Sequence, residues 1–172
     1  HNLATPLLQH TETISDPVAR GAANAEAADA LYELAMLVEP AHAATYCEAA
    51  LDASPSHEGA LARAEQLYSL EQPELLAPRW LAYVEVSTNP EGVRRRRFML
   101  ASAYRNADQL DDWAECMEPL LNDGDPAAAQ ILIEVYRTQG NTKRLIEALN
   151  LVLDQSEAPD RLALIREAVR LN

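Results

Sequence analysis

The stretch from Gly92 to Asn122, GVRRRRFMLASAYRNADQLDDWAECMEPLLN, decides the fold class of this 172-residue chain. It contains two segments in which apolar residues recur every three or four positions, which is the spacing of one face of an α-helix. The residues on these two faces are Leu100, Ala101 and Tyr104, then Leu110, Trp113, Met117 and Leu120. Only a short polar connection separates the segments, so the stretch predicts two antiparallel helices that form a hairpin.

The same plan recurs along the chain, which makes an internal repeat the first hypothesis. Prolines that mark the unit starts stand at positions 17, 55, 90, 126 and 159, which are 38, 35, 36 and 33 residues apart. Four of the five follow an Asp, Ser or Asn, residue types that cap helices, and Pro is favoured at the first helical position. Each capping residue with its proline therefore predicts the end of one hairpin and the start of the next. The tyrosines that recur with a similar period are Tyr32, Tyr68, Tyr104 and Tyr136.

The pattern predicts an all-α fold of about ten helices. We expect an α-solenoid of antiparallel hairpins that forms a single helical-repeat domain over residues 1–172. Its expected units are a partial unit, 1–16, four hairpins, 17–54, 55–89, 90–125 and 126–158, and a second partial unit, 159–172. The helix expected at 161–171 has an apolar face that no later element covers. We therefore expect the chain to be a segment of a longer protein.

Individual residues predict local details of this pattern. Pro78 is expected to kink the helix over 73–87, or to delay its start until just after residue 78. Gly140 suits the left-handed backbone conformation that ends many helices. Thr142 is expected to cap the helix that follows it.

Composition and charge narrow the classes of function. The formal net charge is −13, and such a surface repels nucleic acid and anionic membranes at long range while it favours a basic partner. No run of about eighteen apolar residues is present, so we expect no membrane insertion. Cys47 and Cys116 are expected to be buried thiols rather than a disulfide. With no signal-peptide pattern at the start, these features favour a cytoplasmic protein, or a periplasmic one if a signal lies upstream.

The sequence contains no motif that carries a known catalytic chemistry. It lacks a Gly-rich phosphate loop, His-Glu-x-x-His, Cys-x-x-Cys and Gly-x-Ser-x-Gly. Its histidines, His1, His10, His42 and His57, are scattered, and the spacing of His42 and Cys47 is poor for two ligands of one metal. We therefore expect no enzymatic activity, no cofactor and no metal site.

The segment from Ile131 to Leu153, ILIEVYRTQGNTKRLIEALNLVL, resembles a tetratricopeptide repeat. In that family a unit of about 34 residues has an aromatic residue late in its first helix and a glycine four residues later. Tyr136 and Gly140 match these two positions, and Pro159 lies near the place of the closing proline. The resemblance implies a right-handed superhelix of helical hairpins.

The preceding unit matches the same family less completely. Tyr104 occupies the aromatic position and Pro126 the closing position. Asp108 replaces the glycine, and Trp113 stands where a small residue is usual. Other helical repeat families therefore remain open.

The resemblance also implies where a partner binds, because in that family one stripe of each first helix lines a concave groove. Carried onto this sequence, the stripe comprises Arg95, Phe98, Ser102, Arg105, Gln130, Glu134 and Arg137. In the unit before, the matching residues are small or polar and leave room: Gly59, Ala62, Gln66 and Ser69. We therefore expect a protein–protein interaction module that holds a peptide or a partner helix in this groove.

Four consecutive arginines, Arg94 to Arg97, leave other functions open. Successive helical residues point about 100° apart, so these four cannot form one flat patch. Ion pairing with nearby carboxylates, such as Glu91 or groups on adjacent hairpins, would offset the cost of placing them at a helix start. The alternatives are nucleic-acid binding through this cluster, a regulatory or scaffold role in a larger enzyme or complex, and self-association through the terminal helices.

Overall fold

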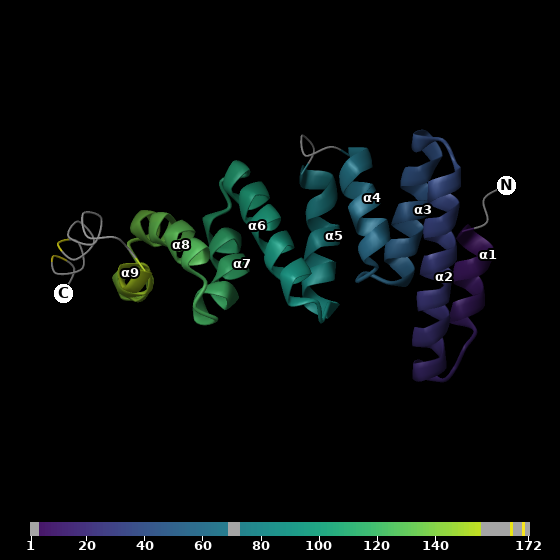
Figure 1. The fold of residues 1–172 in the computed structure, drawn as a ribbon, viewed down its shortest axis with the longest axis horizontal. Coiled ribbons are helices and arrows are strands. Elements are labelled where there is room, and N and C mark those ends of the chain that lie inside the picture. The colour runs from purple at the N-terminus through teal and green to yellow at the C-terminus, as the bar shows by residue number, and fades with distance from the viewer. Residues whose placement is uncertain (1–3, 69–72, 156–165, 167–169, 171–172) are drawn as a thin grey trace. The chain divides into compact units, whose positions relative to one another are not determined.

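The computed structural model describes residues 4–68, 73–155, 166 and 170. Within these residues the regular elements are α-helices, and no strand occurs (Figure 1). The prediction of an all-α fold is therefore confirmed. The helix expected at 161–171 lies almost entirely outside the described residues, as does Ser69. Among the helices that the structure describes, none combines the length and the apolar character that crossing a membrane would require.

The chain divides into two compact units, His1–Arg96 and Arg97–Asn172, which we call unit 1 and unit 2. The boundary falls inside helix α6 (Pro90–Asn106). Each unit has its own buried residues. The superhelical arrangement of hairpins along the whole chain stays a prediction.

The helices of unit 1 are α1 (Ala4–Glu12), α2 (Pro17–Leu37), α3 (Pro40–Ala53), α4 (Glu58–Tyr68), α5 (Pro73–Val86) and the first part of α6. Of these, the helices α1 to α5 pack against their neighbours in chain order (Figure 1). The fully buried residues of α2 and α3 are mostly alanines: Ala28, Leu31, Ala35, Ala43, Cys47 and Ala50. Small side chains let neighbouring helices approach closely, which increases the dispersion contacts between them.

Unit 2 contains the rest of α6, α7 (Leu110–Asn122), α8 (Pro126–Gln139) and α9 (Thr142–Gln155). α8 packs against both α7 and α9. Every helix of this unit contributes at least one large side chain that is at least 98% buried, and α8 contributes two: Leu100, Met117, Leu132, Tyr136 and Leu149. Burial of side chains of this size stabilises the unit by roughly 1.5–3 kcal/mol for each.

Helix starts follow the expected capping rule at three of the unit boundaries, and at one of them Asn89 accepts a hydrogen bond from the Gly92 amide at 3.2 Å. Asp16 accepts a hydrogen bond from the Val18 amide at 3.1 Å. Asp125 accepts hydrogen bonds from the amides of Ala127 and Ala128 at 2.9 and 3.3 Å. In all three helices a proline follows the cap within the first turn. Each cap stabilises its helix by about 1 kcal/mol.

The capping role expected of Ser54 and Pro55 is wrong, although the helix starts close to His57, as expected. Ser54 is the C-terminal cap of α3, and α4 begins three residues after Pro55. His57 supplies the cap instead, because its Nδ1 atom accepts a hydrogen bond from the Ala60 amide at 2.9 Å. The other ring nitrogen lies 3.0 Å from the Asp29 carboxylate on α2, which holds the imidazole in place.

Two further local expectations can be compared with the helix bounds. Of the two alternatives expected at Pro78, the delayed start is wrong, because α5 runs through Pro78 from Pro73. Asn141, rather than Thr142, caps α9, because the Asn141 side-chain oxygen accepts a hydrogen bond from the Arg144 amide at 3.3 Å. Thr142 is itself the first residue of α9.

The backbone is left-handed at equivalent positions of two hairpins. Gly140, four residues after Tyr136, has φ of 68°, as expected. Asp108, four residues after Tyr104, has φ of 57°. Asp is among the non-glycine residues that tolerate this conformation best, so the turn geometry persists although the glycine is absent.

Two glycine-to-alanine substitutions should change stability in opposite directions. Gly21 lies within α2, and an added Cβ would meet no atom within 4 Å, so Gly21→Ala should stabilise the protein by roughly 1 kcal/mol through helix propensity. Gly140→Ala should destabilise it by roughly 1 kcal/mol, because its left-handed backbone disfavours a Cβ. Urea unfolding followed by far-UV circular dichroism measures both changes. Two changes of the same sign would contradict these backbone assignments.

Candidate functional site

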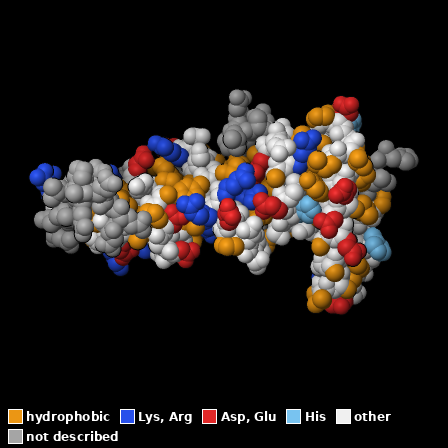
Figure 2. Space-filling model, in the orientation of Figure 1, with side chains coloured by type: hydrophobic (Ala, Val, Ile, Leu, Met, Phe, Trp, Pro, Cys, Tyr) orange, Lys and Arg blue, Asp and Glu red, His pale blue; other side chains and the backbone are white. Residues whose placement is uncertain are grey.

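The four consecutive arginines of α6 have different environments. The Arg96 side chain is fully buried, whereas that of Arg95 is 60% exposed. Arg97 is half-buried and Arg94 is exposed. Figure 2 shows acidic side chains directly beside the basic ones near α5 and α6. The cluster is therefore not one basic surface, as the helical spacing predicts.

Glu65 on α4 is a buried carboxylate at the centre of a polar network in unit 1. It is 8% exposed. Its Oε1 atom accepts hydrogen bonds from Trp80 Nε1 at 3.0 Å and from Arg96 Nε at 3.3 Å. Its Oε2 atom accepts a third from Arg95 at 3.0 Å. Because the donors lie on α5 and α6, this one carboxylate joins three helices.

Arg96 makes a second ionic contact, with Glu58. Its Nη1 atom lies 2.5 Å from Glu58 Oε1, and since neither Nη atom has hydrogen-bond geometry with a described residue, the contact is a close ion pair. The guanidinium also lies over the Tyr83 ring, 4.4 Å from its centroid, which is a cation–π arrangement. The Tyr83 hydroxyl donates to Glu58 Oε2 at 2.5 Å. We call Glu58, Glu65, Trp80, Tyr83, Arg95 and Arg96 the buried network.

Opposing effects act on the pKa of Glu58. Burial raises the pKa, but the hydrogen bond from Tyr83 and the pairing with Arg96 outweigh it and hold the pKa below its ordinary value. Burial and the hydrogen bond to Glu58 raise the pKa of Tyr83. At neutral pH the pair is therefore an ionised carboxylate and a neutral phenol. Neither pKa is shifted towards 7, as that of a general acid or base would be.

The arginines are held mainly by contacts within the protein. The expected ion pairing is confirmed, since two carboxylates of the preceding hairpin pair with Arg95 and Arg96. Arg97 donates a hydrogen bond to the carbonyl oxygen of Cys116 at 2.7 Å. A phosphate outside the protein could not reach Arg96. The cluster therefore offers nucleic acid less charge than its sequence implies.

Both cysteines are free and buried, as expected. Burial raises the pKa of Cys47 and of Cys116 to about 11. The Cys116 thiol also donates a hydrogen bond to the Arg97 carbonyl oxygen at 3.4 Å. A thiol with so high a pKa is almost wholly protonated at neutral pH, so neither cysteine is an activated nucleophile.

Most of the predicted groove residues lie on α6 and α8 of unit 2 and are exposed. We call these five residues the α6–α8 stripe: Ser102, Arg105, Gln130, Glu134 and Arg137. The structure pairs two of them, with Arg105 Nη2 3.4 Å from Glu134 Oε1 and side chains that are 60% and 57% exposed. The Arg105 guanidinium also lies over the Trp113 ring, 5.5 Å from its centroid.

Two other predicted groove residues have partners that stabilise the fold. Arg95 is hydrogen-bonded to the buried Glu65. Phe98 is partly buried and packs against the core of unit 2. The ring of Phe98 therefore helps to hold α6 in place.

The room expected beside the small residues of α4 is filled. A Cβ added at Gly59 would lie 3.0–3.3 Å from atoms of the Tyr32 ring. Tyr32 on α2 therefore covers this part of α4, and the glycine allows that close approach. Ala62 is half-buried and Gln66 is exposed.

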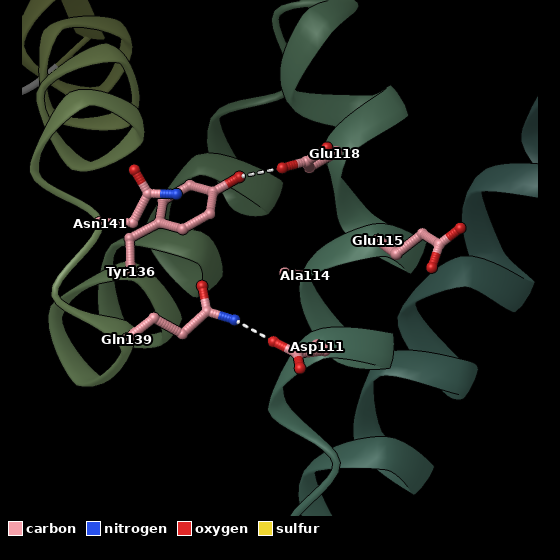
Figure 3. A pocket seen from close by; sticks show the side chains of 7 residues that line it. All are labelled: Asp111, Ala114, Glu115, Glu118, Tyr136, Gln139 and Asn141. Carbon is pink, nitrogen blue, oxygen red and sulfur yellow. Dashed lines mark hydrogen bonds between the residues drawn. The ribbon is translucent and has the colours of Figure 1, made fainter.

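A pocket of about 520 Å³ lies in unit 2 (Figure 3), and the sequence did not predict it. Tyr136 donates a hydrogen bond to Glu118 at 3.0 Å, and Gln139 donates one to Asp111 at 2.8 Å. Both bonds join α7 to α8, and burial together with Glu118 raises the pKa of Tyr136. The spacing of Asp111 and Glu118 on one helix was the available signal, but their partners become close only in the folded chain. The full lining is Asp111, Ala114, Glu115, Glu118, Tyr136, Gln139 and Asn141.

A scan against models of protein families and searches of curated proteins and of solved structures found no match. Across the described part of the chain, no three His, Cys, Asp or Glu side chains are grouped so that they could hold a metal ion. Function must therefore be inferred from the residues of this chain.

Glu65→Leu should destabilise the protein by roughly 3–5 kcal/mol, because it removes the buried carboxylate that pairs with Arg96 and leaves only the half-exposed Glu58 beside that charge. The double variant Glu65→Leu/Arg96→Met should recover part of this loss, since the incompletely paired buried charge is then gone. Urea unfolding measures both. As a control, Glu134→Leu removes a carboxylate from the exposed Arg105 pair and should cost less than about 1 kcal/mol. A double variant that is less stable than Glu65→Leu would refute the ion-pair explanation.

Native Cys47 and Cys116 should react slowly with a thiol reagent. At pH 8 a pKa of about 11 leaves roughly 200-fold less thiolate than an ordinary cysteine has, before burial limits access further. Absorbance of the released thionitrobenzoate measures the rate. The control is the same protein in urea, where both thiols should react at the rate of free cysteine. Fast native reaction would contradict the burial of these thiols.

Proposed function

We propose that this chain is a tetratricopeptide-like, non-catalytic interaction module, and that its α6–α8 stripe binds a peptide or a partner helix of another protein. The proposal rests on one observation above all, the exposed Arg105–Glu134 pair at the middle of the stripe. An ion pair this exposed contributes about 0–1 kcal/mol. A partner can therefore replace either member at little cost.

The helices beneath the stripe are firmly packed, which supports the same function. Ala101 on α6 and the α8 residues that alternate with the stripe, Leu132, Ile133 and Val135, are buried in the core of unit 2. Such a stripe does not need to order itself when a partner arrives. Binding by a preorganised surface avoids much of the entropy loss that weakens association.

The pKa shifts of the described residues give little support to a catalytic function. The titratable groups with shifted pKa values among the described residues are cysteines, tyrosines, Glu58 and Arg144, and no cysteine or tyrosine shift increases the fraction of reactive anion at neutral pH. Catalytic groups generally have pKa values moved towards the working pH. A regulatory or scaffold role in a larger protein is compatible with partner binding and remains the second proposal.

Selection of peptides from a random display library against the immobilised protein tests the proposed function. We expect selected peptides to bind the wild-type chain and to lose at least tenfold in affinity for Arg105→Glu/Glu134→Arg, measured by isothermal titration calorimetry. The double variant keeps an ion pair but exchanges the positions of its two charges. The fold should therefore be retained, while the charge that each position presents to a peptide is reversed.

The matched control reverses a second exposed pair, Asp52 with Arg79, whose atoms lie 2.5 Å apart in unit 1. Asp52→Arg/Arg79→Asp makes the same chemical change away from the stripe and should leave peptide affinity unaltered. Equal loss in both double variants, or no selected peptide that senses Arg105, would reject the stripe as the binding surface.

A further inference from the structure

Trp113 on α7 has a polar atom that its surroundings do not explain. The residue is 5% exposed, and its indole Nε1 is buried with no hydrogen-bond partner among the described residues. Buried N–H groups in native proteins nearly always have an acceptor, so an unpaired one calls for a cause. The other tryptophan, Trp80, has such an acceptor, because its Nε1 donates a hydrogen bond to Glu65.

Arg105 covers this tryptophan from the exposed side of α6. Its guanidinium lies over the indole ring, and among the described residues its ion pair is with the exposed Glu134. Arg105 is a long and flexible side chain, 60% exposed. If a ligand drew the guanidinium aside, it would uncover the face of the indole ring that Arg105 covers. Arg and Trp are also the side chains most enriched among residues that dominate binding energy at protein interfaces.

We propose that Arg105 and Trp113 form an anchor for an acidic side chain of the partner peptide, in which the peptide carboxylate displaces Glu134 from Arg105 and accepts a hydrogen bond from the indole N–H of Trp113. This inference rests on the proposed function of the α6–α8 stripe and specifies its chemistry. A carboxylate suits both donors, because it is acceptor-only and has two oxygens. Glu134 is then an internal competitor that occupies Arg105 in the absence of a partner.

Competition between Glu134 and the peptide carboxylate for Arg105 predicts the direction in which each substitution changes peptide affinity. Glu134→Gln removes the competing charge, so it should tighten the binding of an acidic peptide by about threefold to tenfold. Arg105→Gln should weaken that binding at least tenfold. The matched control is Glu147→Gln, because Glu147 on α9 also forms an ion pair with an arginine, Arg144 at 2.9 Å, although that pair is less exposed than the Arg105 pair. It removes the same unit of charge, so it reports the long-range effect of net charge alone.

The probes are capped decapeptides of alternating Glu and Ala, with Gln–Ala and Lys–Ala counterparts. An uncapped Gln–Ala peptide has a terminal carboxylate but no acidic side chain. It therefore distinguishes binding of a chain terminus from binding of an acidic side chain. Two-dimensional ¹H–¹⁵N spectra resolve the indole N–H signals of Trp80 and Trp113, which Trp113→Phe assigns. We expect the Glu–Ala peptide to shift the Trp113 signal and to leave that of Trp80 in place.

Three results would overturn the anchor: an unmoved Trp113 signal at saturation, equal binding of the Gln–Ala peptide, or equal tightening by Glu134→Gln and Glu147→Gln. A response to the uncapped peptide alone would reject the acidic side chain in favour of a chain terminus. If library peptides bind through the stripe while the Glu–Ala peptide does not, the proposed function stands and the acidic anchor fails. If neither binds, both fail.

Discussion

Unit 1 depends on satisfying one carboxylate inside the protein. Glu65 is 8% exposed, and an ionised group taken from water without partners costs several kcal/mol. Three donors from α5 and α6 meet it, and Arg95 and Arg96 reach it from consecutive positions, one from the surface and one from the interior. This requirement explains why arginines occupy the second turn of α6.

Two of the four periodic tyrosines make the same polar contact. Tyr68 on α4 donates a hydrogen bond to Glu48 on α3, and Tyr136 on α8 donates one to Glu118 on α7. Each bond joins the first helix of a hairpin to the second helix of the hairpin before it. A phenylalanine would fill a similar volume but leave the glutamate without this donor. The repeat therefore positions neighbouring hairpins through a directed contact as well as through apolar packing.

Local signals in the sequence predicted the helices well because their causes are local. Asp16 and Asp125 act as caps, and Gly140 has the backbone that its position demands. The misses have a common physical origin. His57 caps α4 while its other nitrogen is held by Asp29, 28 residues earlier in the chain. Arg96 is buried because carboxylates of α4 reach it, and a periodic pattern within α6 contains no information about α4.

Burial decides what an arginine in this chain does. Arg96 is enclosed by two carboxylates and an aromatic ring, so its charge stabilises the native packing and is closed to any partner. Arg105 also has a carboxylate and an aromatic ring beside it, yet both members of its ion pair face solvent. The same two types of contact thus hold the fold at one site and leave an exchangeable charge at the other. A partner that provided a better-placed carboxylate would compete at Arg105 against a weak contact, and that difference favours the α6–α8 stripe as the proposed recognition surface.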